Sequence, residues 1–190
     1  AISDHLDRSD LDNFVDDFID IAEARHKREL RFRDMLERDP LTVVNRFVDL
    51  PNDFLEAKTI RLLTDPVTVL TNINLYEMNR VRSETNGKPT WFTIHETIEF
   101  DRTPNKAYSG EIVFYKELKP LSDSNTKNAL LTKAPDIYLY SCLAAAAPFL
   151  MHTEMVQLWE TLYANGRDAL MKVDRKQSGP LISRVAGATP

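Results

Sequence analysis

Residues 128–150 read NALLTKAPDIYLYSCLAAAAPFL, a segment in which a Pro-Asp pair opens a long apolar run. Proline suits the first turn of a helix, where no backbone donor is needed, and Asp136 suits the positive end of the helix dipole. Apolar residues then recur at helical spacing, and the alanines at 145–147 would let a neighbouring helix approach closely. The segment predicts a buried helix over residues 135–150 and carries no catalytic pattern.

The N-terminal part of the chain predicts a single long helix. Ser9 and Asp12 have the spacing of a capping box, and an apolar stripe then follows one helical face. Aspartates fill the first half of this segment and basic residues fill the second half, an order that complements the helix dipole. We expect the helix to end before Asp39 and Pro40, because proline cannot continue it.

Beyond residue 147 the helical pattern meets a proline and then resumes. Pro148 is expected to kink or divide the helical run. An apolar stripe that includes Trp159 and Tyr163 predicts a last helix that reaches Val173. Residues 175–190 contain Gly, Pro and Ser without helical spacing, so they predict an extended C-terminal tail.

The middle of the chain carries the signals for strands and turns. Residues 41–49 are rich in valine and favour an extended segment, and residues 50–54 predict a turn that leads into a short helix toward Leu63. Asn74 predicts the start of another short helix, to about Arg82. A small antiparallel meander of about three or four strands is predicted by the β-rich runs at 91–94, 97–100 and 111–115.

These patterns together predict an α+β fold that is mostly helical. We expect a helical bundle with a small antiparallel β-meander at about residues 88–117, C-terminal helices at about 135–173, and an extended C-terminal tail. The 190 residues fit a single domain over residues 1–174, followed by the tail at 175–190.

The composition is that of a protein with a sizeable core and an acidic surface. Hydrophobic residues make up 43% of the chain, and the formal net charge is -5. An acidic chain is poorly suited to bind DNA phosphates over its whole surface, so binding of nucleic acid would need a local basic face. Cys142 is the only cysteine, so we expect a buried thiol and a reducing compartment. Residues 1–10 lack the pattern of a signal peptide, and no apolar run is long enough to predict a membrane span.

The search for chemical groups predicts no catalytic residue, no cofactor site and no metal site. The four histidines are isolated from other metal-ligating residues. His95 and Glu99 lie in a segment predicted to form strands, where they are explained as polar surface residues on neighbouring strands. The basic cluster at residues 25–33 is the one nucleic-acid candidate. Pairing of this cluster at i,i+4 spacing with Glu23, Glu29 and Glu37 offers a simpler explanation, that of a solvated or subunit-facing helix side.

A series of short motifs lies in order between residues 50 and 170. It begins with LPNDFL at 50–55, GKP at 87–89 before an aromatic strand, and FYxxL leading to PLS at 114–122. It continues with NxLLxxxPDxYLY at 128–140, the alanine-rich helix, and Trp159 with Tyr163. As an ordered set, these motifs resemble the head–tail adaptor (connector) proteins of tailed bacteriophages, notably those of short-tailed phages.

This resemblance implies a structural role without catalysis. Such adaptors assemble as a homo-oligomeric ring, typically a dodecamer, beneath the portal protein after DNA packaging. The ring extends the DNA channel and offers a platform for tail proteins of the nozzle or tail tube. Genomic DNA passes through the lumen without specific binding, including during genome ejection. We therefore expect a virion protein at the head–tail interface, made in the host cytoplasm and not associated with a membrane.

Two sets of residues are candidates for contacts in such an assembly. Portal contacts are expected from the tail residues Leu181, Ile182, Arg184 and Val185. Closed rings use complementary opposite faces, for which a helix acidic at one end and basic at the other is suited. The subunit-interface candidates are therefore Asp16, Asp20, Arg25, Arg28, Arg31 and Arg33. The alternative function is a DNA- or RNA-binding regulatory protein that uses the basic helix face at 25–33; an enzyme ranks third.

Overall fold

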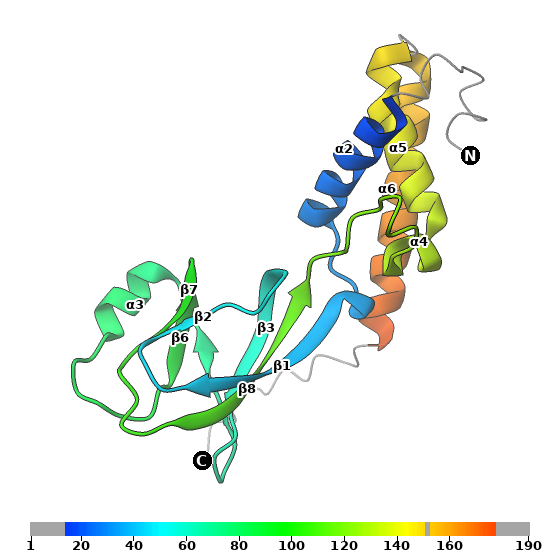
Figure 1. Cartoon of the computed structure of the whole chain (residues 1–190). Helices are drawn as coiled ribbons and strands as arrows, with labels where there is room; N and C mark the ends of the chain where they lie inside the picture. The colour runs from blue at the N-terminus through cyan, green and yellow to red at the C-terminus, as the bar shows by residue number, and fades with distance from the viewer. Residues whose placement is uncertain (1–13, 151–152, 178–190) are drawn as a thin grey trace, which may run out of the picture. The chain divides into compact units, whose positions relative to one another are not determined.

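The chain forms two compact units, and the middle of the chain forms a unit that is inserted into the one formed by the N-terminal and C-terminal parts (Figure 1). The computed structural model describes residues 14–150 and 153–177. One compact unit contains the chain up to Asp34 and again from Leu118, and the other contains Met35–Glu117. The chain therefore crosses between the two units twice. The single domain over residues 1–174 stays a prediction.

Helices form the unit built by the chain ends. They are α2 (Val15–Glu29), the short α4 (Ala129–Lys133), α5 (Pro135–Leu150) and α6 (Thr153–Gln177). α2 and α6 both pack against α5, and the three long helices lie side by side in Figure 1. Their shared core contains Phe18, Leu143, Ala146, Ala147 and Trp159. Within the described range, no helix is long and apolar enough to cross a bilayer.

The predictions for the C-terminal helices are confirmed in their main points. α5 begins at Pro135, with Asp136 in its first turn. Pro148 lies near its end, and a new helix starts at Thr153, so the helical run is divided as expected. α6 continues to Gln177, so the tail predicted from residue 175 begins too early. The capping box at Ser9 and the rest of the tail lie outside the described residues.

The long N-terminal helix predicted up to Asp39 is wrong, because α2 ends at Glu29. Leu30 turns the backbone to an extended conformation and, like Phe32, is fully buried. A 3₁₀ turn, η2 (Arg33–Met35), then leads into strand β1 (Leu36–Val43). Pro40 fits in β1 because this strand is at the edge of its sheet, where a missing N–H leaves no partner unpaired.

The inserted unit contains two four-stranded sheets. The first has the antiparallel order β1-β8-β3-β4, with β3 at Phe54–Leu62, β4 at Thr68–Val69 and β8 at Tyr108–Lys116. The second has the order β2-β7-β6-β5, with strands at Phe47–Asp49, Thr97–Phe100, Trp91–Ile94 and Thr71–Asn72. The β5–β6 pair is parallel. Eleven buried residues of this unit, among them Ile60, Phe92, Phe100, Ile112 and Phe114, form one core.

Strand β3 replaces the helix that the sequence predicts toward Leu63. This segment pairs with β8 over most of its length, and Ile60 and Leu62 alternate inward to the core. The α+β class is therefore confirmed, but the chain is not mostly a helical bundle with a small meander. Strands β6 and β7 have the predicted bounds. Helix α3 (Leu75–Val81) is confirmed too, with Asn74 accepting a hydrogen bond from the Glu77 N–H at 2.9 Å.

Gly110 in β8 is held between the backbones of its two neighbouring strands. A Cβ at this position would lie 2.7 Å from the Arg61 carbonyl oxygen. We expect Gly110→Ala to lower the free energy of unfolding by about 1–3 kcal/mol, because backbone must move. Gly87→Ala is the matched control, since its Cβ would meet only the flexible Arg102 side chain, at 3.1 Å. Urea unfolding that ranks the two variants equally would contradict this reading.

The alanines of α5 make the tight helix contact that the sequence predicts. Ala146 and Ala147 are buried, and Ala145 is partly buried. We expect Ala146→Leu to overpack this contact and to cost about 1–3 kcal/mol of stability. Ala169→Leu, at an exposed position of α6, should have almost no effect. Thermal unfolding of both variants tests this, and an unchanged melting temperature for Ala146→Leu would rule it out.

Candidate functional site

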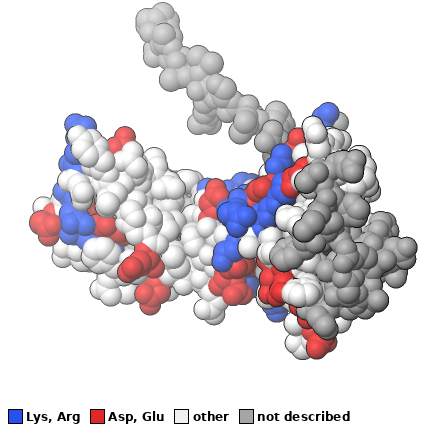
Figure 2. All heavy atoms as spheres, turned by 90° about the horizontal axis from the view of Figure 1, so that it is seen from above, with Lys and Arg blue, Asp and Glu red and all other residues white. Residues whose placement is uncertain are grey.

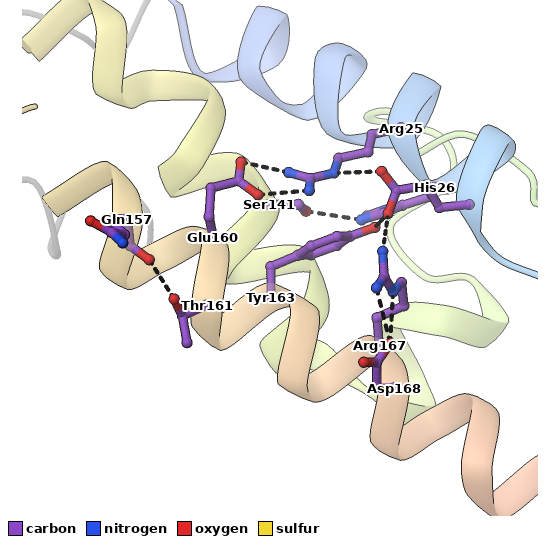
Figure 3. A network of polar contacts seen from close by, with 10 residues as sticks. Arg25, His26, Ser141, Gln157, Glu160, Thr161, Tyr163, Arg167 and Asp168 are labelled. Carbon is purple, nitrogen blue, oxygen red and sulfur yellow. Dashed lines mark hydrogen bonds and ion pairs between the residues drawn. The ribbon is translucent and has the colours of Figure 1, made fainter.

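A polar network centred on Arg25 joins α2 to α6 (Figure 3). The Nη1 and Nη2 atoms of Arg25 donate to the two carboxylate oxygens of Glu160 at 2.8 and 2.7 Å. Its Nε donates to Glu29 at 3.0 Å. The guanidinium lies over the Tyr163 ring, 3.9 Å from its centroid. The hydrogen bonds to Glu160 raise the pKa of Arg25 further above its ordinary value.

Glu29 is the second junction of this network. Its other carboxylate oxygen accepts from Arg167 Nη1 at 2.8 Å and from the Tyr163 hydroxyl at 3.1 Å. Burial opposes ionisation of Glu29, but hydrogen bonds from Arg167 and Arg25 outweigh it and lower its pKa. Burial, followed by the neighbouring Glu29 charge, raises the pKa of Tyr163. Two arginines and a tyrosine thus converge on one carboxylate.

His26 lies at the centre of the three helices and is almost completely buried. Its Nε2 is 2.9 Å from the Ser141 hydroxyl, which donates to the Tyr138 carbonyl oxygen. The imidazole stacks on Tyr163 and meets Tyr138 edge-on. Because the Ser141 proton is committed to the carbonyl, we assign the His26 proton to Nε2. Burial, with a further contribution from Arg25, lowers the pKa of His26 to about 4.

A second set of hydrogen bonds ties the chain returning from the inserted unit to α2 and α5. Glu23 accepts from the Leu121 N–H at 2.8 Å and from the Tyr138 hydroxyl at 2.9 Å. Asn128 donates to Tyr138 at 2.5 Å and caps α4 by accepting from the Leu131 N–H. These bonds hold the returning segment against the three-helix core.

Two adjoining hollows open beside α2 within the helical unit. The first has a volume of about 450 Å³, and its lining is almost entirely apolar; it includes Leu131, Leu139 and Cys142. The second has a volume of about 470 Å³ and is polar, with Asp16, Asp20 and Asp123 in its lining. Ile19 and Leu121 line both hollows, so the two lie next to each other, and together they are called the groove. Burial raises the pKa of the Cys142 thiol to about 12, which keeps it protonated.

The predicted basic face at residues 25–33 does not form one exposed patch. Arg25 is turned toward Glu160 and Glu29, which confirms the predicted i,i+4 pairing for Glu29. Of the other two predicted partners, Glu23 accepts from Leu121 and Tyr138, and Glu37 pairs with Lys116. Arg31 donates to the Lys27 and Leu30 carbonyl oxygens at the end of α2. Arg33, which donates through its backbone N–H to Asp174, and Arg28 are exposed.

The other sequence candidates lie elsewhere. Asp16 and Asp20 are exposed and line the groove. Leu181, Ile182, Arg184 and Val185 lie outside the described residues, so their portal contacts stay a prediction. In the inserted unit Glu99 is buried and paired with Arg82, so its expected place among surface polar residues is wrong.

The sequence reasoning missed the partners that α6 contributes to the network. Glu160 and Arg167 are 135 and 138 residues away from the α2 residues that they contact. Only their seven-residue separation, which places both on one helix face, offers a local signal. Across the part of the chain that the structure describes, no group of three His, Cys, Asp or Glu residues could hold a metal ion.

The buried His26 makes stability depend on pH. Its pKa is about 4 in the folded chain against 6.5 when exposed, so the unfolded chain binds the extra proton first. Stability should therefore fall as the pH drops from about 6.5 to 4, by an amount on the order of 3 kcal/mol from this group. Urea unfolding between pH 7 and pH 4 measures this loss.

His26→Gln removes the titrating group and retains an amide that can donate to Ser141. The variant should lose less stability over the same pH interval than the unmodified chain. Equal pH slopes for the two chains would show that carboxylates, and not His26, govern the acid response.

Comparison with known proteins places the chain in a family. No curated protein matches it. A family model described as SU10 adaptor protein matches residues 1–184, which span both compact units and nearly the whole chain. This match confirms the resemblance to phage head–tail adaptors that the ordered motifs indicate. The chain belongs to the SU10 adaptor protein family, a family of phage adaptor proteins.

Proposed function

We propose that this protein is a structural head–tail adaptor that assembles as a ring, a dodecamer by resemblance, beneath the portal of a tailed phage. The ring extends the DNA channel and carries the attachment platform for the nozzle or tail tube. The observation that carries this proposal is the family match over residues 1–184. The proposed role is mechanical and needs no cofactor, and the protein acts in the virion at the head–tail interface.

The construction of the chain supports a mechanical role. The inserted unit is joined to the helical unit by two covalent connections, near Asp34 and near Leu118. Force on one unit therefore reaches the other through two chain segments. Each segment is anchored in the helical unit: Asp34 pairs with Lys133 at 2.9 Å, and the Leu121 N–H donates to Glu23.

The distribution of charge suits a channel through which DNA slides. Lys and Arg lie among Asp and Glu on the face drawn in Figure 2, with no broad area of one sign. The net charge is -5, and a surface of this kind gives phosphates little to hold. Mixed charge also suits the complementary faces that a closed ring needs, to which Asp16, Asp20, Arg28 and Arg33 contribute in this proposal.

The alternative of a regulatory protein that binds DNA or RNA through residues 25–33 is not favoured. Such a face needs unneutralised cations. Arg25, the first residue of this face, has all three of its guanidinium nitrogens bonded to Glu29 and Glu160.

Imaging the protein with the portal of its phage tests the proposal. Light scattering gives the mass of the protein alone and after mixing, and negative-stain microscopy gives the shape. We expect a closed ring of adaptor subunits on one end of the portal. The ring should survive added chelator, because no metal takes part in the proposed contacts.

A control measurement addresses the alternative function. Binding of duplex DNA should be weak and unspecific at physiological salt. Small particles that leave the portal bare and bind one DNA or RNA sequence tightly would refute the adaptor proposal and favour a regulator.

A further inference from the structure

The groove beside α2 has the chemistry of a docking site for the C-terminal segment of this same chain. We propose that it receives residues 181–185 from a neighbouring copy, with Ile182 in the apolar hollow and Arg184 at the acidic hollow. The inference rests on the proposed ring, because it needs adjacent copies. It would make the tail a clasp between subunits.

The apolar hollow supplies the first half of the argument. Leu131, Leu139 and Ile19 are partly exposed in its lining, although α2, α4 and α5 surround it. At about 450 Å³ it has room for more than one aliphatic side chain. Covering these side chains would contribute about 25 cal/mol for each Å² of apolar surface removed from water.

The acidic hollow supplies the second half. Asp16, Asp20 and Asp123 lie in its lining, and Ile19 and Leu121 connect it to the apolar hollow. A ligand for the whole groove therefore needs an apolar side chain followed closely by a positive charge.

Residues 181–185 have this order of side chains, since they read LISRV. In an extended segment Ile182 and Arg184 point to the same side, about 7 Å apart. This spacing suits two hollows that share lining residues. An arginine also pairs well with carboxylates at an exposed site because its donors form a planar fork.

The direction of α6 favours a neighbouring copy over the same chain. Arg25 meets Glu160, and the Arg33 N–H meets Asp174, so α6 runs parallel to α2 and ends beyond it. From Trp159, which shares a core with Phe18, α6 extends about 27 Å to Gln177. The seven residues from Gln177 to Arg184 span at most about 25 Å. To reach the acidic hollow, the tail of the same chain would have to run back along α6 in a fully extended conformation. The tail of a neighbouring copy can enter from another direction and does not have to cover this length.

Two other occupants have less support. The N-terminal residues 1–13 carry four aspartates and one arginine, a charge that the acidic hollow repels. The portal is the partner that the sequence alone predicts for the tail. The described residues provide a complementary site within the adaptor itself, and the experiment below separates these possibilities.

Disulfide trapping between two different full-length chains tests the proposal. Both chains carry Cys142→Ala; one also carries Leu131→Cys in the groove and the other Ile182→Cys in the tail. Mixing under mild oxidation should give a disulfide-linked pair of unlike chains. In the matched control, the groove chain carries Val173→Cys in place of Leu131→Cys and is mixed with the same Ile182→Cys chain. Val173 is half-exposed on α6 and lies outside the groove, so this pair should give little product.

Charge reversal tests the acidic hollow. Arg184→Glu in the tail chain should lower the yield of the linked pair by about fivefold, as expected for an exposed ion pair with several carboxylates. Combining it with Asp16→Arg and Asp20→Arg in the groove chain should restore the yield.

Four outcomes would overturn the proposal. The first is a yield of linked pair no higher than that obtained with Val173→Cys, and the second is a disulfide within a single chain that carries both Leu131→Cys and Ile182→Cys. The third is a yield that rises when residues 1–13 are deleted, which would mean that these residues fill the groove. The fourth is cross-linking of Ile182→Cys to the portal alone. Ring formation on the portal is scored separately with the unmodified chain. Rings without trapping refute only the clasp, and trapping without rings refutes only the adaptor proposal.

Discussion

The helical unit depends on one guanidinium group. Arg25 joins two carboxylates on different helices and covers the face of Tyr163, so a single side chain fixes the spacing of α2 and α6. Each group in this network would be costly to bury alone and is stable because its neighbours satisfy it. His26 completes the arrangement as a neutral ring between Tyr163 and Ser141. The groove lies beside this network, which holds α2 and thus one of its walls in place.

The insertion of the sheets explains why α2 is short. A chain that must leave the helical unit at Asp34 has to end its helix earlier, and the buried Leu30 and Phe32 fix that exit. The return at Leu118 is fixed by Glu23 and Asn128, which bind the incoming backbone. Side chains of α2 and α4 thus define where one unit stops and the other starts.

Local sequence signals predict those parts of the fold that local interactions stabilise. Pro135 with Asp136 marks the start of α5, and Asn74 caps α3, because caps depend on residues within one turn. Strand β3 could not be predicted from local signals, because its conformation is determined by pairing with β8, which lies some fifty residues later in the chain. The groove was not predictable either, because its walls come from α2, α4, α5 and a loop. The family resemblance succeeded because ordered motifs record the whole fold.

Pro40 in β1 bears on how copies of this protein can associate. Edge strands invite pairing between molecules, and a protein gathered in many copies at one place is especially exposed to open-ended sheet growth. A proline in the outermost strand removes a donor from that edge, and Arg38 and Asp39 beside it add charge. Edge-to-edge pairing of sheets from different molecules is thereby disfavoured. In the proposed ring, copies would then recognise one another through side chains, whose geometry can close an assembly at a fixed number.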